Sequence, residues 1–160
     1  MQLDTLPLAW AAHRLGGIQS PANAAYEVSE LEYQLKNSGA KALFTCLPLL
    51  KTAQEAAKRS GIPSDRIYLL ELPKIFTGQD NPSGIKTVGD LIREGAKEER
   101  LEPLNWEKGD GAKKVAFLCY SSGTSGLPVR LICGNVDMRI LTIHLERRHD
   151  LTSERHRKYA

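Results

Sequence analysis

Long apolar runs are missing from this 160-residue chain, and their absence argues against a membrane-spanning helix. No stretch approaches the roughly 18 consecutive apolar residues that a span requires. The N-terminal sequence MQLDTLPLAWAAHRLGG also lacks a long apolar centre, and Asp4 stands where a secretory signal carries positive charge. We therefore expect an intracellular protein, either cytoplasmic or peroxisomal.

Clustered cysteines are also missing. The three cysteines, Cys46, Cys119 and Cys133, are dispersed and form no Cys-x-x-Cys pair. This spacing fits neither a disulfide framework nor a structural metal site, so we expect buried, reduced thiols. Hydrophobic residues make up 41% and charged residues 26%, which is ordinary for one globular domain with a core of its own.

Net charge is missing from most of the chain. Residues 129–160 contain seven Lys or Arg and four Asp or Glu, which accounts for the net charge of +3 of the whole protein. Residues 1–128 are therefore electrically balanced. Such a shift indicates a segment of a different kind after residue 128.

Predicted helices and strands alternate along residues 1–122, and the strands show little alternation of apolar and polar residues. This pattern is typical of a parallel sheet that is covered on both faces. We predict an α/β fold, a partial parallel sheet with flanking helices. The expected helices are 3–15, 29–39, 47–61 and 87–95, and the expected strands are 40–46, 66–72 and 113–122. Residues 18–21 are a short strand or an extended segment, and 73–86 is a loop.

Helix ends carry recognisable signals. Ser29 with Glu32 three residues later is a capping box for the helix 29–39, and Thr87 caps the helix 87–95. Gly39 and Gly61 follow the last turns of their helices, where a left-handed residue commonly ends a helix.

A Ser/Gly-rich loop, YSSGTSGLP at 120–128, follows the last apolar strand. Its glycines permit positive φ, its successive N–H groups can surround phosphate oxygens, and its hydroxyls add donors. It is not a Walker A loop, because no Lys-Ser/Thr follows the glycines. The alternative is a flexible surface loop, since Ser and Gly are common in such loops. The candidate nucleotide-binding residues are Ser121, Ser122, Gly123, Thr124, Ser125 and Gly126.

The string YSSGTSGLP resembles the phosphate-binding signature of the adenylate-forming acyl-CoA synthetases, the AMP-binding superfamily. The stretch DTLPLAWAAHRLGGIQSPANAAYEVSELEYQLKNSGAKALFTC is similar to 4-coumarate–CoA ligase-like enzymes, so the resemblance covers 3–128. It implies part of the large N-terminal domain of these enzymes. It also implies ATP, Mg²⁺, coenzyme A and a small carboxylic acid as cofactors and substrates of the full-length protein, with loop 121–126 on the β- and γ-phosphates.

The resemblance stops at Pro128. The family pattern continues with Lys-Gly, whereas this chain has Val129 and Arg130. Synonymous codons can be chosen for 146–160 that, when read one base later, spell K-G-V-M-I-S-H-R-N-V-I-A-N-T, the family's continuation. Our hypothesis is that 129–145 is a translated intron and 146–160 an out-of-frame exon. We therefore predict two regions: 1–128, a partial AMP-binding domain, and 129–160, an aberrant basic tail with no strand or helix tied to the core.

Three functions fit these observations. The first is a fragment of an ATP-dependent acid–thiol ligase that is inactive alone, because the family's adenine, ribose and acyl pockets and its C-terminal domain lie beyond the resemblance. The second is a non-catalytic module that contacts a nucleotide or a partner. The third is a basic-tailed nucleic-acid binder, which we disfavour because the tail lacks interleaved aromatic residues. We predict no metal site, since His144, His149 and His156 match no zinc spacing.

Overall fold

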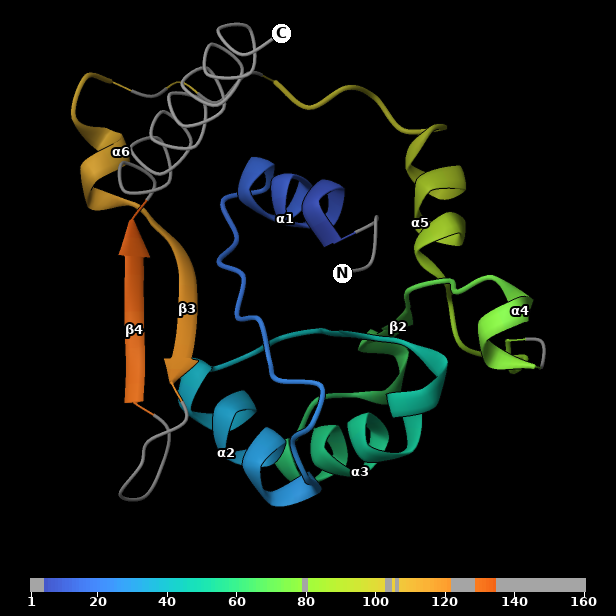
Figure 1. Cartoon of the computed structure of the whole chain (residues 1–160). Coiled ribbons are helices and arrows are strands. Elements are labelled where there is room, and N and C mark those ends of the chain that lie inside the picture. The colour runs from blue at the N-terminus through green and yellow to red at the C-terminus, as the bar shows by residue number, and fades with distance from the viewer. Residues whose placement is uncertain (1–4, 79–80, 103–104, 106, 122–128, 135–160) are drawn as a thin grey trace, which may run out of the picture.

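The computed structural model describes residues 5–78, 81–102, 105, 107–121 and 129–134 of the chain (Figure 1). Helices and strands alternate from α2 to β2, whereas α4, α5 and α6 follow one another and β3 is followed by β4. The predicted α/β class is confirmed. Among the described residues no helix is long and apolar enough to cross a membrane. The elements are α1 (Thr5–Arg14), α2 (Val28–Ser38), β1 (Leu43–Thr45), α3 (Leu50–Ser60), β2 (Ile67–Leu69), α4 (Lys74–Thr77), α5 (Val88–Gly95), α6 (Asp110–Lys113), β3 (Val115–Ser121) and β4 (Val129–Gly134), with 3₁₀ turns at Leu47–Leu49 and Ser64–Arg66.

The strands form two small sheets. Strands β1 and β2 pair in parallel, as the sequence predicts. Phe44 lies opposite Tyr68 in this pair. The segment 18–21, expected as a short strand or an extended segment, makes a single parallel bridge, between Gln19 and Phe117 of β3. The expected strands at 40–46 and 66–72 are each three residues long, and a short helix, α4, lies within the expected loop 73–86.

Strands β3 and β4 form an antiparallel hairpin in which Ser121 pairs with Val129 and Phe117 with Cys133. The prediction that no strand follows Pro128 is therefore wrong for Val129–Gly134. These residues are rich in the β-branched and apolar types that favour a strand, and an antiparallel partner needs only a short connection. The rest of the predicted tail, 135–160, lies outside the described residues.

The apolar core lies where α2 packs on α3, beside β2 (Figure 1). Leu31 and Leu35, four residues apart, share one face of α2, while Ala56 and Ala57 of α3 are fully buried. Alanine leaves room for the two helices to approach closely, and Ile67 of β2 completes the cluster.

Helix ends follow most of the sequence signals. Gly39 and Gly61 have φ of 65° and 74°, so the predicted glycine stops are confirmed. The predicted cap at Ser29 is wrong, because α2 begins after Glu27, whose N–H donates to Glu30 Oε2 at 2.9 Å. Glu32, the other half of the predicted capping box, instead pairs with Lys36 one turn later, at 2.6 Å.

Thr87 is the N-cap of α5, as predicted. Thr87 Oγ1 accepts the N–H of Asp90 at 3.1 Å, and the Thr87 N–H donates to Asp90 Oδ2 at 2.8 Å. The Thr87 N–H and hydroxyl, together with the Arg93 guanidinium, lower the pKa of Asp90 to about 2. The predicted capping signal at this helix is confirmed.

Candidate functional site

The β3–β4 hairpin forms the base of the loop that the sequence singles out (Figure 1). Ser121 is the last residue of β3 and pairs with Val129, the first residue of β4. The two residues that flank the segment 122–128 are therefore paired in one ladder. The other predicted phosphate-binding residues, Ser122, Gly123, Thr124, Ser125 and Gly126, lie outside the described residues.

The main chain of β3 is attached to the extended segment that follows α1. The Gln19 N–H donates to the Ala116 carbonyl at 3.0 Å, and the Leu118 N–H donates to the Gln19 carbonyl at 2.9 Å. The Ser20 hydroxyl adds a third bond, to the Leu118 carbonyl at 2.9 Å. These bonds fix the strand just before Ser121.

Two side chains from helices also hold β3. His13 of α1 places Nε2 2.9 Å from the Ala116 carbonyl, so Nε2 is the protonated nitrogen, and its ring meets Phe117 edge-on at 4.9 Å. The Tyr120 hydroxyl donates to Asn37 Oδ1 of α2 at 2.7 Å. The position before Ser121 is therefore tied directly to α2.

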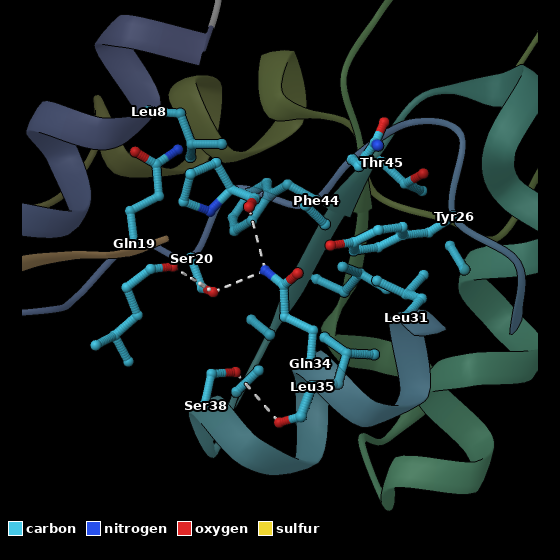
Figure 2. Close-up of a pocket in the computed structure, with 18 of the residues that line it drawn as sticks. Leu8, Gln19, Ser20, Tyr26, Leu31, Gln34, Leu35, Ser38, Phe44 and Thr45 are labelled. Atoms are coloured by element: carbon cyan, nitrogen blue, oxygen red, sulfur yellow. Dashed lines mark hydrogen bonds between the residues drawn. The ribbon is translucent and has the colours of Figure 1, made fainter. Parts of the chain in front are cut away.

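A pocket of about 800 Å³ lies behind β3, between α1, the segment 17–24, α2 and β1. Figure 2 shows Gln34 of α2 in its wall, with the amide nitrogen directed toward Ser20. Gln34 Nε2 donates to Ser20 Oγ at 2.9 Å and to the Pro21 carbonyl at 3.1 Å. Because Ser20 in turn donates to Leu118, hydrogen bonds run from the pocket wall to β3.

Sequence reasoning missed these supporting residues. His13, Ser20, Gln34 and Asn37 belong to no motif, and each acts on a residue that is distant in the sequence or on another element. No local signal in the chain identifies them. Of the predicted phosphate-loop residues, the structure describes Ser121, which pairs with Val129.

The described residues can supply backbone and hydroxyl donors near the loop base, but no cluster of metal ligands. In this part of the chain no group of three or more His, Cys, Asp or Glu side chains could hold a metal ion.

The sequence matches a known enzyme family and two curated fungal relatives. Residues 2–129 match the family described as AMP-binding enzyme. The acyl-CoA ligase easD of Emericella nidulans is 42% identical over 125 residues, which cover 78% of this chain and 22% of that enzyme. The acyl-CoA ligase cm3C of Cordyceps militaris is 38% identical over 129 residues, covering 78% and 20%. The chain thus spans about a fifth of the length of these curated relatives.

Solved structures give the same fold. A red-emitting luciferase from Phrixothrix hirtus superposes with a TM-score of 0.64 at 17% identity, over 84% of this chain and 31% of the luciferase. The anthranilate CoA ligase AuaEII, solved in complex with anthranoyl-AMP, gives 0.62 at 20% identity, over 79% and 22%. At these identities the likeness concerns the fold alone.

Proposed function

Because this chain belongs to the AMP-binding enzyme family, we propose that it is part of an ATP-dependent ligase that joins a carboxylic acid to the thiol of coenzyme A. The observation that carries the proposal is the hairpin closed by Ser121 and Val129, which holds both ends of the Ser/Gly loop. Acyl-CoA ligases among the relatives, and the anthranoyl-AMP bound to a structural neighbour, support this class of reaction.

The proposed reaction of the full-length protein has two steps. A carboxylate oxygen of the acid attacks the α-phosphorus of ATP, the bond to the β-phosphate oxygen breaks, and pyrophosphate leaves. The thiolate of coenzyme A then attacks the acyl carbon, AMP leaves with the oxygen, and the thiol proton passes to solvent. The first step places growing charge on the leaving pyrophosphate, and fixed donors around it lower the barrier.

We assign the phosphate contacts to Ser121, Ser122, Gly123, Thr124, Ser125 and Gly126. Their N–H and hydroxyl groups are donors to phosphate oxygens, and the two glycines allow the backbone to approach closely. Gln19 and Ser20 anchor β3, the strand that ends at Ser121, where the proposed phosphate contacts begin.

For the 160-residue chain itself we propose phosphate binding without turnover. The described residues supply the support of one phosphate loop, and the chain spans about a fifth of its relatives. In-line attack also requires a held acid and a held adenosine. We expect no acid-dependent pyrophosphate release with ATP, Mg²⁺, coenzyme A and a panel of carboxylic acids.

Titration with ATP, AMP and inorganic tripolyphosphate tests this assignment. If the loop contacts only the β- and γ-phosphates, ATP and tripolyphosphate bind and AMP does not. Thr124→Ala removes one hydroxyl donor to a charged oxygen and should weaken ATP binding about tenfold. Ser83→Ala, in the exposed Pro-Ser-Gly turn, is the matched control and should change nothing. Equal binding of AMP and ATP, or equal effects of the two substitutions, would contradict the proposal.

We also propose that residues 129–160 form a translated intron followed by an out-of-frame exon. The family match ends at Val129, beside Pro128, and synonymous codons for 146–160 exist whose shifted reading gives the family's continuation. The pairing of Val129–Gly134 with β3 does not decide their origin, because apolar and β-branched residues pair readily wherever they arise. Sequencing of cDNA across the Pro128 codon tests the idea. Transcripts that all retain the insert, in a gene without the shifted motif, would refute it.

We propose a cytoplasmic or peroxisomal location, as expected from the composition of residues 1–17. Imaging of the tagged chain tests this location, and secretion into the medium would rule it out.

A further inference from the structure

The Ala116 carbonyl in β3 accepts two hydrogen bonds. The Gln19 N–H donates to it at 3.0 Å, and His13 Nε2 lies 2.9 Å from it. Ala116 is 0% exposed, and a buried carbonyl requires at least one donor, which Gln19 already supplies. The bond from His13 is therefore an addition to a satisfied group, and it attaches α1 to a strand 103 positions later in the sequence.

The two donors belong to one unit of the chain. Helix α1 ends in a Schellman turn, in which the Gly17 N–H donates to the Ala12 carbonyl at 2.8 Å and the Gly16 N–H to the His13 carbonyl at 3.0 Å. Gly16 has φ of 73°, a conformation that favours glycine. The turn directs the chain from α1 into the extended segment that contains Gln19, so the helix and the segment reach the same carbonyl.

The His13 ring also contacts β3. It meets the Phe117 ring edge-on, with the centroids 4.9 Å apart and the planes at 90°. Aromatic pairs favour this T-shaped arrangement. Because the contact limits rotation of the imidazole, it orients Nε2 toward the Ala116 carbonyl.

Strand β3 connects this attachment to the proposed phosphate site. The strand runs from Val115 to Ser121, the first of the proposed phosphate-binding residues, and it is paired with β4. Since the residues of a paired strand move together, a change in the position of Ala116 relative to α1 shifts Ser121 as well. Phosphate donors that are held in place beforehand bind at a lower cost than donors that must first be ordered.

Arg14, the next residue of α1, holds a different part of the chain. Its guanidinium donates to the Leu101 carbonyl at 2.7 Å and to the Glu102 carbonyl, both outside the hairpin. His13 and Arg14 thus offer a direct comparison, because they are neighbours on one helix and both bond to distant carbonyls, but His13 bonds to β3 itself.

We propose that His13 is a positioning residue for the phosphate site, and that its Nε2–H fixes β3 relative to α1 so that Ser121 is in place before the ligand binds. His13 acts through Ala116 and is not assigned a contact with the ligand. The inference rests on the proposed function and deepens it, because it assigns part of the affinity for a polyphosphate to a side chain of α1.

Two substitutions separate the donor from the ring. His13→Phe keeps an aromatic ring beside Phe117 and removes the donor, whereas His13→Gln supplies an amide donor without the ring. Calorimetry with inorganic tripolyphosphate measures the affinity of the 160-residue chain and of each variant. We expect His13→Phe to bind about three- to tenfold more weakly, and His13→Gln to stay within about twofold of the unchanged chain. Arg14→Gln is the matched control and should also stay within about twofold.

Hydrogen exchange followed by NMR, without ligand, shows whether the variants remain folded. The Leu118 amide, which donates to the Gln19 carbonyl, should exchange faster in His13→Phe than in the unchanged chain. The amides of Ala56 and Ala57, in the core of α3, should remain protected, because the Ala116 carbonyl keeps its bond from Gln19. A merely structural residue would change the stability of the fold and leave the affinity of the folded chain unaltered.

The outcomes separate this inference from the proposed function. If the unchanged chain binds no tripolyphosphate, the proposed function fails and this inference fails with it. If the unchanged chain binds and His13→Phe binds equally well, this inference alone fails. Equal weakening by His13→Gln would show that the donor is not responsible, and equal weakening by Arg14→Gln would assign the effect to α1 as a whole.

A last variant covers the case in which the phenylalanine does not fit. If His13→Phe loses the protection of α3, His13→Leu replaces it, since leucine is smaller and also lacks a donor. Weaker binding by a folded His13→Leu supports the inference. Loss of protection in both variants would show that His13 is required for the fold itself, and would overturn the positioning role.

Discussion

The two halves of the molecule are held together in different ways. In the half formed by α2, α3, β1 and β2, buried apolar side chains pack against one another, with Ala56 and Ala57 fully buried. In the half formed by α1 and the β3–β4 hairpin, Ala9 and Ala116 are buried, and several hydrogen bonds join elements that are distant in the sequence. These bonds join residues as far apart as His13 and Ala116, or Ser20 and Leu118.

This difference bears on the proposed phosphate loop, which extends from the second half. Apolar packing between neighbours in sequence forms early and resists local opening, whereas a few hydrogen bonds between distant residues give less stability. Trp10 of α1 remains 67% exposed and Leu6 52% exposed, so α1 adds little apolar burial of its own. We infer that the hairpin opens before the α2–α3 half.

The largest expected effect is on the packed half. Leu69 of β2 is completely buried, so Leu69→Ala should lower the free energy of unfolding by about 2–5 kcal/mol. Urea unfolding followed by circular dichroism measures the change. Leu101→Ala, at a residue 57% exposed, is the control and should change it by less than about 0.5 kcal/mol. Similar losses of unfolding free energy in both variants would show that buried apolar packing at Leu69 does not stabilise this half more than an exposed side chain does.

A smaller effect is expected where the halves meet, at Ser20. Its hydroxyl accepts from Gln34 and donates to Leu118, so Ser20→Ala breaks the link between α2 and β3. The loss should be about 1–2 kcal/mol. Hydrogen exchange should become faster in β3 and remain slow in α2 and α3. The exposed Ser64→Ala is the matched control, and equally faster exchange in α3 would contradict the distinction between the halves.

Much of the packed half could be predicted from the sequence, and much of the hairpin half could not. Apolar spacing and glycine stops such as Gly39 and Gly61 are local signals, and they identified the helices of the first half. The cap of α2 was misplaced because Glu27 and Ser29 both stand near its start and only the fold selects between them. Contacts such as Tyr120 with Asn37 join residues 83 positions apart, and no local pattern encodes them.

The strand β4 was missed for a different reason. The family resemblance ends at Pro128, so the following residues were expected to be unpaired, whereas their own composition favours a strand beside β3. The closing of the loop at Ser121 depends on this pairing.

A still smaller effect is expected at Tyr120. Its hydroxyl bond to Asn37 lies at the surface, so Tyr120→Phe should cost about 0.5 kcal/mol. Tyr33→Phe, on α2, is the matched control. If Tyr120 positions the loop, ATP affinity should fall more in Tyr120→Phe than in the control while overall stability hardly changes. An unchanged affinity would show that the bond stabilises the hairpin without positioning the loop.

The smallest effect concerns α5, which lies between the two halves along the chain. The pKa of Asp90 is lowered to about 2, chiefly by hydrogen bonds from Thr87, with Arg93 adding to them. A carboxylate whose folded pKa lies below its unfolded value of 3.8 contributes stability above pH 3.8 and loses it as the pH falls toward 2. The first turn of α5 should therefore open over this range, seen as faster exchange at Asp90 and Leu91 by NMR.

Asp90→Asn should remove the pH dependence, and Asp65→Asn, at an exposed site outside α5, should leave it intact. If α5 opened with the same pH profile in both variants, another acid would be responsible. If α2 and α3 opened over the same pH range as α5, α5 would unfold as part of the packed half.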